Sequence, residues 1–187
     1  MILPIRLYGD PVLRNGAEDV AGDSASVQQL IDDMIETMRG ASGIGLAAPQ
    51  VGRTERIFVA DLAAEIQFEP VPEEASQPMA FINPEIIWES EEEGEFEEGC
   101  LSIPDITEAV KRSERIRLTY LDRHFQPQEL EVGELPARVI QHEVDHLEGI
   151  FFVDRISAFR RRLLRRKLRD VASGKAEADY PLYAGTK

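Results

Sequence analysis

The sequence has one cysteine, one tryptophan and three histidines among its 187 residues. A single cysteine excludes an internal disulfide, which fits a reducing compartment. No apolar stretch approaches the length of a membrane span, and the N-terminus lacks a basic region followed by a long apolar run, so we expect neither a membrane span nor a signal peptide. These absences predict a cytoplasmic protein, and the length and 43% apolar content predict one domain over residues 1–187.

Basic side chains are scarce: 21 Lys and Arg stand against 35 Asp and Glu, a net charge of −14. The imbalance is uneven, because residues 1–153 carry 11 basic and 31 acidic side chains, whereas residues 154–187 carry 10 basic and 4 acidic. We therefore expect the body to repel nucleic acid, which argues against DNA binding, and the tail to have a separate task.

The first half of the chain shows one helical pattern and then strand patterns. Apolar residues recur three or four positions apart over 24–39, which predicts an amphipathic helix. Residues 55–62 and 79–88 are rich in Ile, Val and Phe and are predicted strands. The acidic, proline-bearing segment 63–77 between them is a predicted exposed loop.

The acidic run 89–99 is predicted to form a solvated hairpin or loop anchored by Phe96 and the apolar residues after Cys100, followed by short strands. These strands are expected at 107–112, 115–123 and 128–135.

From residue 135 the apolar period becomes helical, with Pro136 suited to a first turn and Gly149 to a stop. Residues 151–156, "FFVDRI", are a predicted strand, and residues 156–171 are a predicted basic helix. The order helix, strands, helix, helix predicts an α+β fold.

The stretch "SGIGLAAPQ" at 42–50 matches the spacing of a dinucleotide-binding loop at Gly43, Gly45 and Ala48. Such a loop needs a strand before it and a helix after it. Here a helix precedes the loop, and Pro49 blocks a helix starting at Gly45. The stretch therefore predicts a tight glycine turn that leads into an extended segment.

The stretch "HEVDH" at 142–146 predicts a metal site. Residues four apart share a helix face, so His142 and His146 can bind one ion while Glu143 accepts a proton from metal-bound water. The third ligand is open between Cys100, whose thiolate suits such ions, and His124, which lies in a predicted hairpin turn.

Two other interpretations remain at this point. A zinc endopeptidase would take its third ligand downstream, where Glu148 and Glu177 are available but no histidine is. A binding module with a closed structural metal site would need His124 to complete four protein ligands.

Three motifs together resemble the peptide deformylase family: "GIGLAAPQ" (43–50), "EGCLS" (98–102) and "QHEVDHL" (141–147). The resemblance runs from "YGDPVLR" near the start to the basic terminal helix. It implies a metal-bearing helix surrounded by antiparallel sheets, with an N-terminal helix and a basic C-terminal helix. It also implies hydrolytic removal of the formyl group from N-formylmethionine at the start of newly synthesised polypeptides, with release of formate.

Carried over to this sequence, the resemblance implies that Cys100, His142 and His146 hold the metal, with water as the fourth ligand. The metal-bound water would attack the formyl carbon, with Glu143 as general base and then acid. Gln50 and the backbone N–H of Leu101 would face the formyl oxygen, and one such donor is typically worth about 3 kcal/mol.

The resemblance also implies the substrate-binding residues. Gly45 would offer backbone hydrogen bonds, and the methionine pocket would be lined by Ile44, Phe96, Leu135 and Val139. Arg138 either lines this pocket with its aliphatic stem or points along the path of the following peptide residues.

Ligand types alone suggest zinc. The resemblance instead implies Fe²⁺, with Ni²⁺ or Co²⁺ as functional substitutes and Zn²⁺ as a poorer one.

The basic tail has two interpretations. One helix face, composed of Ile156, Phe159, Leu163, Leu164 and Leu168, is spaced to pack on the body, which would leave the arginines simply solvated. The resemblance implies instead that this helix docks on the ribosome near the emerging chain.

Overall fold

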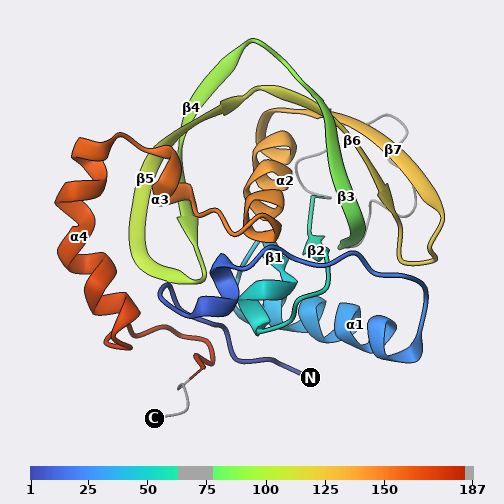
Figure 1. The fold of residues 1–187 in the computed structure, drawn as a ribbon, viewed down its shortest axis with the longest axis horizontal. Helices are drawn as coiled ribbons and strands as arrows, with labels where there is room; N and C mark the ends of the chain where they lie inside the picture. Colours follow the sequence, from blue (N-terminus) through green and yellow to red (C-terminus); the bar gives the residue numbers. More distant parts are fainter. Residues whose placement is uncertain (63–77, 184–187) are drawn as a thin grey trace.

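The computed structural model describes residues 1–62 and 78–183 and has the predicted α+β fold. Two antiparallel sheets lie around the central helix α2 (Figure 1). The larger sheet has the spatial order β1 (Gly45–Ala47), β2 (Ile57–Ala60), β3 (Met79–Glu89), β6 (Arg115–Leu121) and β7 (Pro127–Gly133). The smaller sheet is a hairpin of β4 (Glu93–Cys100) and β5 (Ile103–Ser113). The acidic loop predicted at 63–77 lies outside the described residues.

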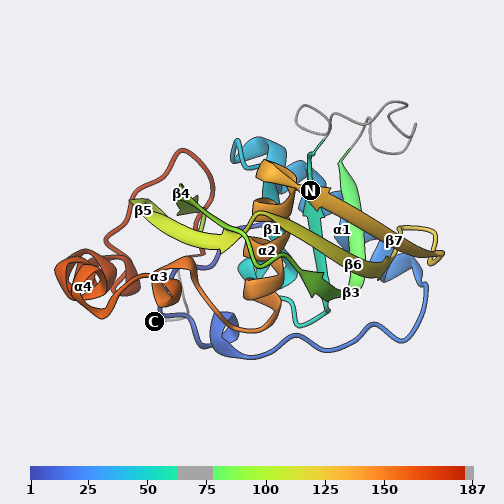
Figure 2. The same cartoon turned by 90° about the horizontal axis from the view of Figure 1, so that it is seen from above.

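Helices flank these sheets on several sides (Figure 2). The α-helices are α1 (Ala25–Gly40), α2 (Glu134–Leu147), the short α3 (Phe152–Arg155) and α4 (Ala158–Ala172). Two 3-10 helices, η1 (Pro11–Arg14) and η2 (Ala48–Val51), lie in the N-terminal part. Within the described residues, no helix has the length and apolar character needed to cross a membrane.

The larger sheet packs between α1 and α2, because successive side chains of a strand point to opposite faces. On β2, Phe58 belongs to the same core cluster as Ile140 of α2. The next residue, Val59, belongs to a second cluster with Ile31 and Met34 of α1. Both faces of the short strand β2 are therefore buried, one against α1 and the other against α2.

The helices predicted at 24–39 and from residue 135 are confirmed as α1 and α2. Ser24 caps α1 by accepting a hydrogen bond from the Val27 N–H at 3.3 Å, and this serine precedes the predicted apolar periodicity. Beyond α2, Gly149 has a φ of 72°. A Cβ at that position would lie 2.5 Å from the carbonyl oxygen of Arg14, so glycine is needed where the chain leaves the helix.

The acidic run forms the first strand of the β4–β5 hairpin. Glu95 pairs with Lys111 and Glu97 with Ala109, and both glutamates are exposed. The register shifts between Glu98 and Cys100, where the hairpin reaches α2. The hairpin prediction is confirmed, although Phe96 does not anchor it, because its side chain is 65% exposed.

The strand predicted at 151–156 is wrong, because this segment contains α3. Its apolar residues Phe151, Phe152 and Val153 are all buried, as a strand prediction assumes. The carboxylate of Asp154, however, accepts a hydrogen bond from the Phe151 N–H at 2.9 Å, which closes a helical turn instead.

The basic helix predicted at 156–171 is α4, but its apolar face is narrower than expected. Leu164, Leu168 and Val171 are buried against the body. Phe159 and Leu163 are 67% and 61% exposed, so the prediction that both pack on the body is wrong. The solvent-facing side of α4 therefore combines arginines with two large apolar side chains.

Candidate metal centre

The helix α2 presents two imidazoles on one buried face. His142 and His146 lie one turn apart, and their Nε2 atoms are 3.2 Å from each other. Burial and the neighbouring His142 hold the pKa of His146 well below its usual range, so its imidazole is neutral. A neutral imidazole with a free lone pair is the form that binds a metal ion.

Cys100, at the end of β4, completes a group of three side chains that could hold a metal ion. Its Sγ lies 3.2 Å from Nε2 of His146, and the ligand atoms of Cys100, His142 and His146 all lie within 4.8 Å of one another. Burial would lower the pKa of His142, but the Cys100 sulfur and the Glu98 carboxylate outweigh it and raise that pKa to about 10. A divalent cation would take the place of that proton, and the three ligand atoms, one sulfur and two nitrogens, suit such an ion.

The alternative third ligands lie elsewhere. His124 is exposed in the turn between β6 and β7. The carboxylate of Glu148 is 2.6 Å from the Arg56 guanidinium. Glu177 lines a surface cavity that Cys100 also lines, but it is not part of the group of close ligand atoms. Among the described residues, Cys100 is therefore the side chain that joins the two histidines.

A buried carboxylate orients His142 from behind. Glu98 Oε2 lies 3.0 Å from Nδ1 of His142, while Arg112 donates to both Glu98 oxygens at 2.6 and 2.8 Å. Burial would raise the pKa of Glu98, but the hydrogen bonds from Arg112 and His142 outweigh it and hold the pKa at about 2. The ionised carboxylate thus fixes the ring so that Nε2 faces the cluster.

Arg112 links this carboxylate to a second one on α2. It is 3% exposed and donates to Asp145 Oδ2 at 2.8 Å. Asp145 also forms an ion pair with Arg155, the last residue of α3. The network therefore connects β4, β5, α2 and α3 around the candidate metal ligands.

Glu143 lies beside the ligands and against the glycine turn. Its Oε2 is buried and has no hydrogen-bond partner among the described residues. Burial, helped by the charges of Glu98 and Asp145, outweighs the opposing cations and raises the pKa of Glu143 to about 7. A carboxyl with this pKa can both accept and donate a proton near neutral pH.

The glycine turn brings a polar amide to the same place. Gln50, in η2, accepts a hydrogen bond from the Ala47 N–H at 2.8 Å through Oε1. Its Nε2 then points to Cys100 Sγ at 3.5 Å and to Ser102 Oγ at 3.3 Å. The turn leads into β1 and a 3-10 helix, as expected for a segment that does not bind a dinucleotide.

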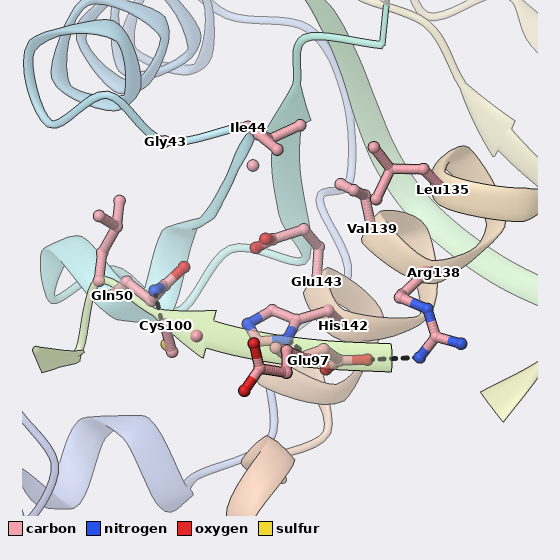
Figure 3. A pocket seen from close by; sticks show the side chains of 14 residues that line it. Gly43, Ile44, Gln50, Glu97, Cys100, Leu135, Arg138, Val139, His142 and Glu143 are labelled. Atoms are coloured by element: carbon pink, nitrogen blue, oxygen red, sulfur yellow. Dashed lines mark hydrogen bonds and ion pairs between the residues drawn. The ribbon is translucent and has the colours of Figure 1, made fainter. Parts of the chain in front are cut away.

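A cavity of about 270 Å³ opens beside these groups (Figure 3). Glu143 and His142 lie on one side of it, and Gln50 and Cys100 on another. Of the residues assigned from the resemblance, the cavity is lined by Ile44, Gly45, Gln50, Cys100, Leu101, Leu135, Val139, His142 and Glu143. Phe96 is not among the lining residues, and its ring centre lies 5.1 Å from the Arg138 guanidinium.

Arg138 lines the cavity, while its guanidinium is held away by fixed partners. It donates to Glu98 Oε1 at 3.0 Å, to the Val110 carbonyl at 3.0 Å and to the Gly94 carbonyl at 2.9 Å. Only its stem is therefore available to a molecule in the cavity.

The sequence interpretation missed the supporting residues Glu98, Arg112 and Asp145. Glu98 lies within the motif at 98–102, but the surrounding acidic run is typical of a solvated surface. Two of them could have been found from their closeness in sequence to the candidate ligands: Glu98 is two residues from Cys100, and Asp145 lies between the two histidines. Nothing local to Arg112 indicates its burial.

Comparison with known proteins gives consistent matches. Residues 2–162 match the family model described as polypeptide deformylase. The chain is 59% identical over 187 residues to a peptide deformylase of Salinibacter ruber, and the alignment covers 97% of this chain and 94% of that relative. It is also 43% identical over 185 residues to a peptide deformylase of Flavobacterium psychrophilum, with 96% of this chain and 95% of the relative covered.

Solved structures agree with these matches. A peptide deformylase from Legionella pneumophila has a TM-score of 0.81 at 38% identity, covering 95% of this chain and 99% of that chain. An actinonin-bound class I type b peptide deformylase from Acinetobacter baumannii has a TM-score of 0.74 at 37% identity, covering 84% and 99%.

Proposed function

This chain belongs to the polypeptide deformylase family and is a hydrolase that removes N-terminal formyl groups, and we propose that it does so through a metal ion held by Cys100, His142 and His146. A divalent ion at such a site lowers the pKa of bound water from about 15.7 toward 7 and polarises an amide carbonyl. The convergence of three ligand atoms within 4.8 Å supports this site.

Glu143 is the proposed proton carrier, and its position in the site is the main support for this role. Its unpaired Oε2 lies in the buried site, and its pKa of about 7 suits proton transfer in both directions. Glu143 accepts the proton of the attacking water and delivers it to the departing amine nitrogen. The formyl C–N bond is thereby hydrolysed. The formyl group leaves as formate, and the methionine keeps a free amino group.

Gln50 and the backbone N–H of Leu101 are the proposed donors to the formyl oxygen, which gains negative charge during attack. Both residues line the cavity, and the Gln50 amide is oriented because Ala47 and Ser102 hold its two ends. The formyl oxygen would replace the Cys100 sulfur as the acceptor for one Nε2–H, while Ser102 holds the other and keeps the amide oriented toward the developing charge.

The methionine side chain is proposed to bind against Ile44, Leu135 and Val139. These residues form the apolar part of the cavity, and Ile44 is still 46% exposed, so it is available to a substrate. Gly45 is proposed to hold the peptide by backbone hydrogen bonds. Phe96, also assigned to this pocket by the resemblance, could act only at its outer edge because it lies on the exposed hairpin.

Fe²⁺ is the proposed ion, with Ni²⁺ or Co²⁺ as active substitutes and Zn²⁺ as a poorer one. The mixed sulfur and nitrogen ligands accommodate all four ions and do not select one of them. The choice of Fe²⁺ is therefore supported by the family resemblance alone.

Nascent formylmethionyl chains on the ribosome are the proposed substrates, with α4 as the docking element in the cytoplasm. Arg162, Arg165 and Arg166 are exposed and form no ion pair with any residue that the structure describes. They are thus available for RNA phosphates. The exposed Phe159 and Leu163 add apolar contact area on the same helix.

The proposed function is tested by formate release from a formyl-Met-Ala-Ser peptide. Anaerobically prepared protein should release formate with Fe²⁺, and the metal-free protein should not until Fe²⁺ is restored. Equal turnover by fully metal-free protein would contradict metal dependence. Cleavage of an internal peptide bond in an unformylated peptide would instead favour an endopeptidase.

A further inference from the structure

The chain after α4 folds back across the molecule to the N-terminal segment (Figure 1). We name residues 175–183 the C-terminal strap. The Ile5 N–H donates to the Pro181 carbonyl at 2.9 Å, and the Tyr183 N–H donates to the Ile5 carbonyl at 2.8 Å. The Tyr183 ring lies 3.3 Å below the Arg6 guanidinium. The strap is therefore anchored at both ends, by α4 and by the N-terminal segment.

Between these anchors, Tyr180 reaches the turn between β4 and β5, next to Cys100. Its hydroxyl donates a 2.8 Å hydrogen bond to the Leu101 carbonyl oxygen. The ring is half-buried and packs with Leu101 against the α1 core cluster. Burial, aided by the Cys100 sulfur and Asp105, raises the pKa of Tyr180 to about 12, so the hydroxyl stays a donor at every physiological pH.

The Leu101 carbonyl belongs to the peptide unit whose N–H is that of Ser102. This Ser102 N–H donates to Cys100 Sγ at 3.4 Å. An amide that accepts at its oxygen becomes a stronger donor at its nitrogen, because linked hydrogen bonds polarise one another. The Tyr180 hydroxyl thus acts on the Cys100 sulfur through one peptide unit, without touching it.

We propose that Tyr180 is a positioning residue that orients Cys100 and strengthens the hydrogen bond to its sulfur, an inference that rests on the proposed role of Cys100 as a metal ligand. The same contact holds the backbone of Leu101, whose N–H is the proposed donor to the formyl oxygen. Tyr180 lies outside residues 2–162, the part of the chain that the family model matches.

The alternative is that the strap only covers the core. The substitution Tyr180→Phe separates these cases because it removes the hydroxyl and keeps the ring. Tyr183→Phe is the matched control, since it lies in the same strap and keeps its ring beneath Arg6. The Tyr183 hydroxyl donates no hydrogen bond to any residue within the described ranges.

Two spectroscopic measurements report on the sulfur directly. In metal-free, ¹⁵N-labelled protein, Tyr180→Phe should move the Ser102 amide proton upfield, as its hydrogen bond to sulfur weakens. In Co²⁺-loaded protein, the thiolate-to-cobalt charge-transfer band should move to longer wavelength, because the sulfur loses stabilisation. Since Cys100 is the only cysteine, the band has one possible source.

Tyr180→Phe should also release Co²⁺ to a chelator roughly threefold to tenfold faster, which is less than the effect of removing a direct partner of a ligand. Its kcat for the formyl peptide should fall while KM stays within twofold, and Tyr183→Phe should match the parent throughout. An unchanged Ser102 resonance and cobalt band in Tyr180→Phe, or equal changes in Tyr183→Phe, would overturn the inference while leaving the proposed function intact. A parent protein without a cobalt–thiolate band would overturn both this inference and the proposed role of Cys100 as a metal ligand.

Discussion

The carboxyl group of Glu143 lies directly against the backbone of Gly45: a Cβ built on residue 45 would be 2.8 Å from the carboxyl carbon. This contact explains the glycine in the turn on steric grounds. Any side chain at residue 45 would displace the carboxylate from the place where the proposed proton transfer occurs.

The substitution Gly45→Ala should therefore lower kcat by roughly 100-fold, because displacing a catalytic group by about 1 Å can cost that much. Metal content should not change, since the ligands lie on other residues. Gly22→Ala is the control, because a Cβ there meets nothing within 4 Å. Parent-like turnover in Gly45→Ala would show that the Glu143 position tolerates movement and would contradict the contact's role.

The Glu98 carboxylate should matter for metal affinity. Glu98→Gln keeps the shape of the side chain but removes the charge that binds Arg112 and orients His142. Loss of such a partner typically weakens metal binding about 10–100-fold, and that decrease is expected in a competitive chelator titration. Glu95→Gln, on the exposed side of the same strand, should bind metal like the parent. Equal affinities in the two variants would exclude an orienting role.

The methionine pocket can be filled from α2. Val139 is 9% exposed and lines the cavity, so Val139→Phe should occupy the volume of the substrate side chain. We expect kcat/KM for formyl-Met-Ala-Ser to fall roughly 10–100-fold, with a smaller loss for formyl-Ala-Ala-Ser, which needs less space. Equal losses for the two peptides would place the methionine side chain elsewhere.

The docking role of α4 depends on charge. Substituting Arg162, Arg165 and Arg166 by Glu should abolish salt-sensitive cosedimentation with ribosomes and leave turnover of the formyl peptide unchanged. The triple Lys variant keeps the charge and should retain most of the binding. Undiminished cosedimentation of the Glu variant would reject docking through these arginines.

Much of the fold could be predicted from residue patterns of short range. The helix predicted at 24–39 is α1, because a serine cap and a regular apolar face specify it locally. The segment 151–156 was misassigned because a short buried apolar run has no readable period, and a single side-chain contact by Asp154 closes it as a helix. The exposure of Phe159 and Leu163 also depends on how α4 meets the body.

Some residues of the candidate site could likewise be predicted from the sequence, and others could not. Its assigned metal ligands, Cys100, His142 and His146, lie within short motifs, and the structure brings them together. Arg112 and Tyr180 lie far from these motifs in the sequence and act through contacts that only the folded chain creates.

Formate release by Glu143→Gln, with bound Fe²⁺ quantified in the same sample, tests whether Glu143 carries the proton at an intact metal site. We expect one Fe²⁺ per chain and a rate at least about 100-fold below the parent, within the range expected for a lost general acid–base group. Glu148→Gln, at the end of the same helix, should keep both Fe²⁺ and activity, because its partner is Arg56 rather than the cluster. A Glu143→Gln protein that retains Fe²⁺ and turns over at more than about a tenth of the parent rate would contradict the account.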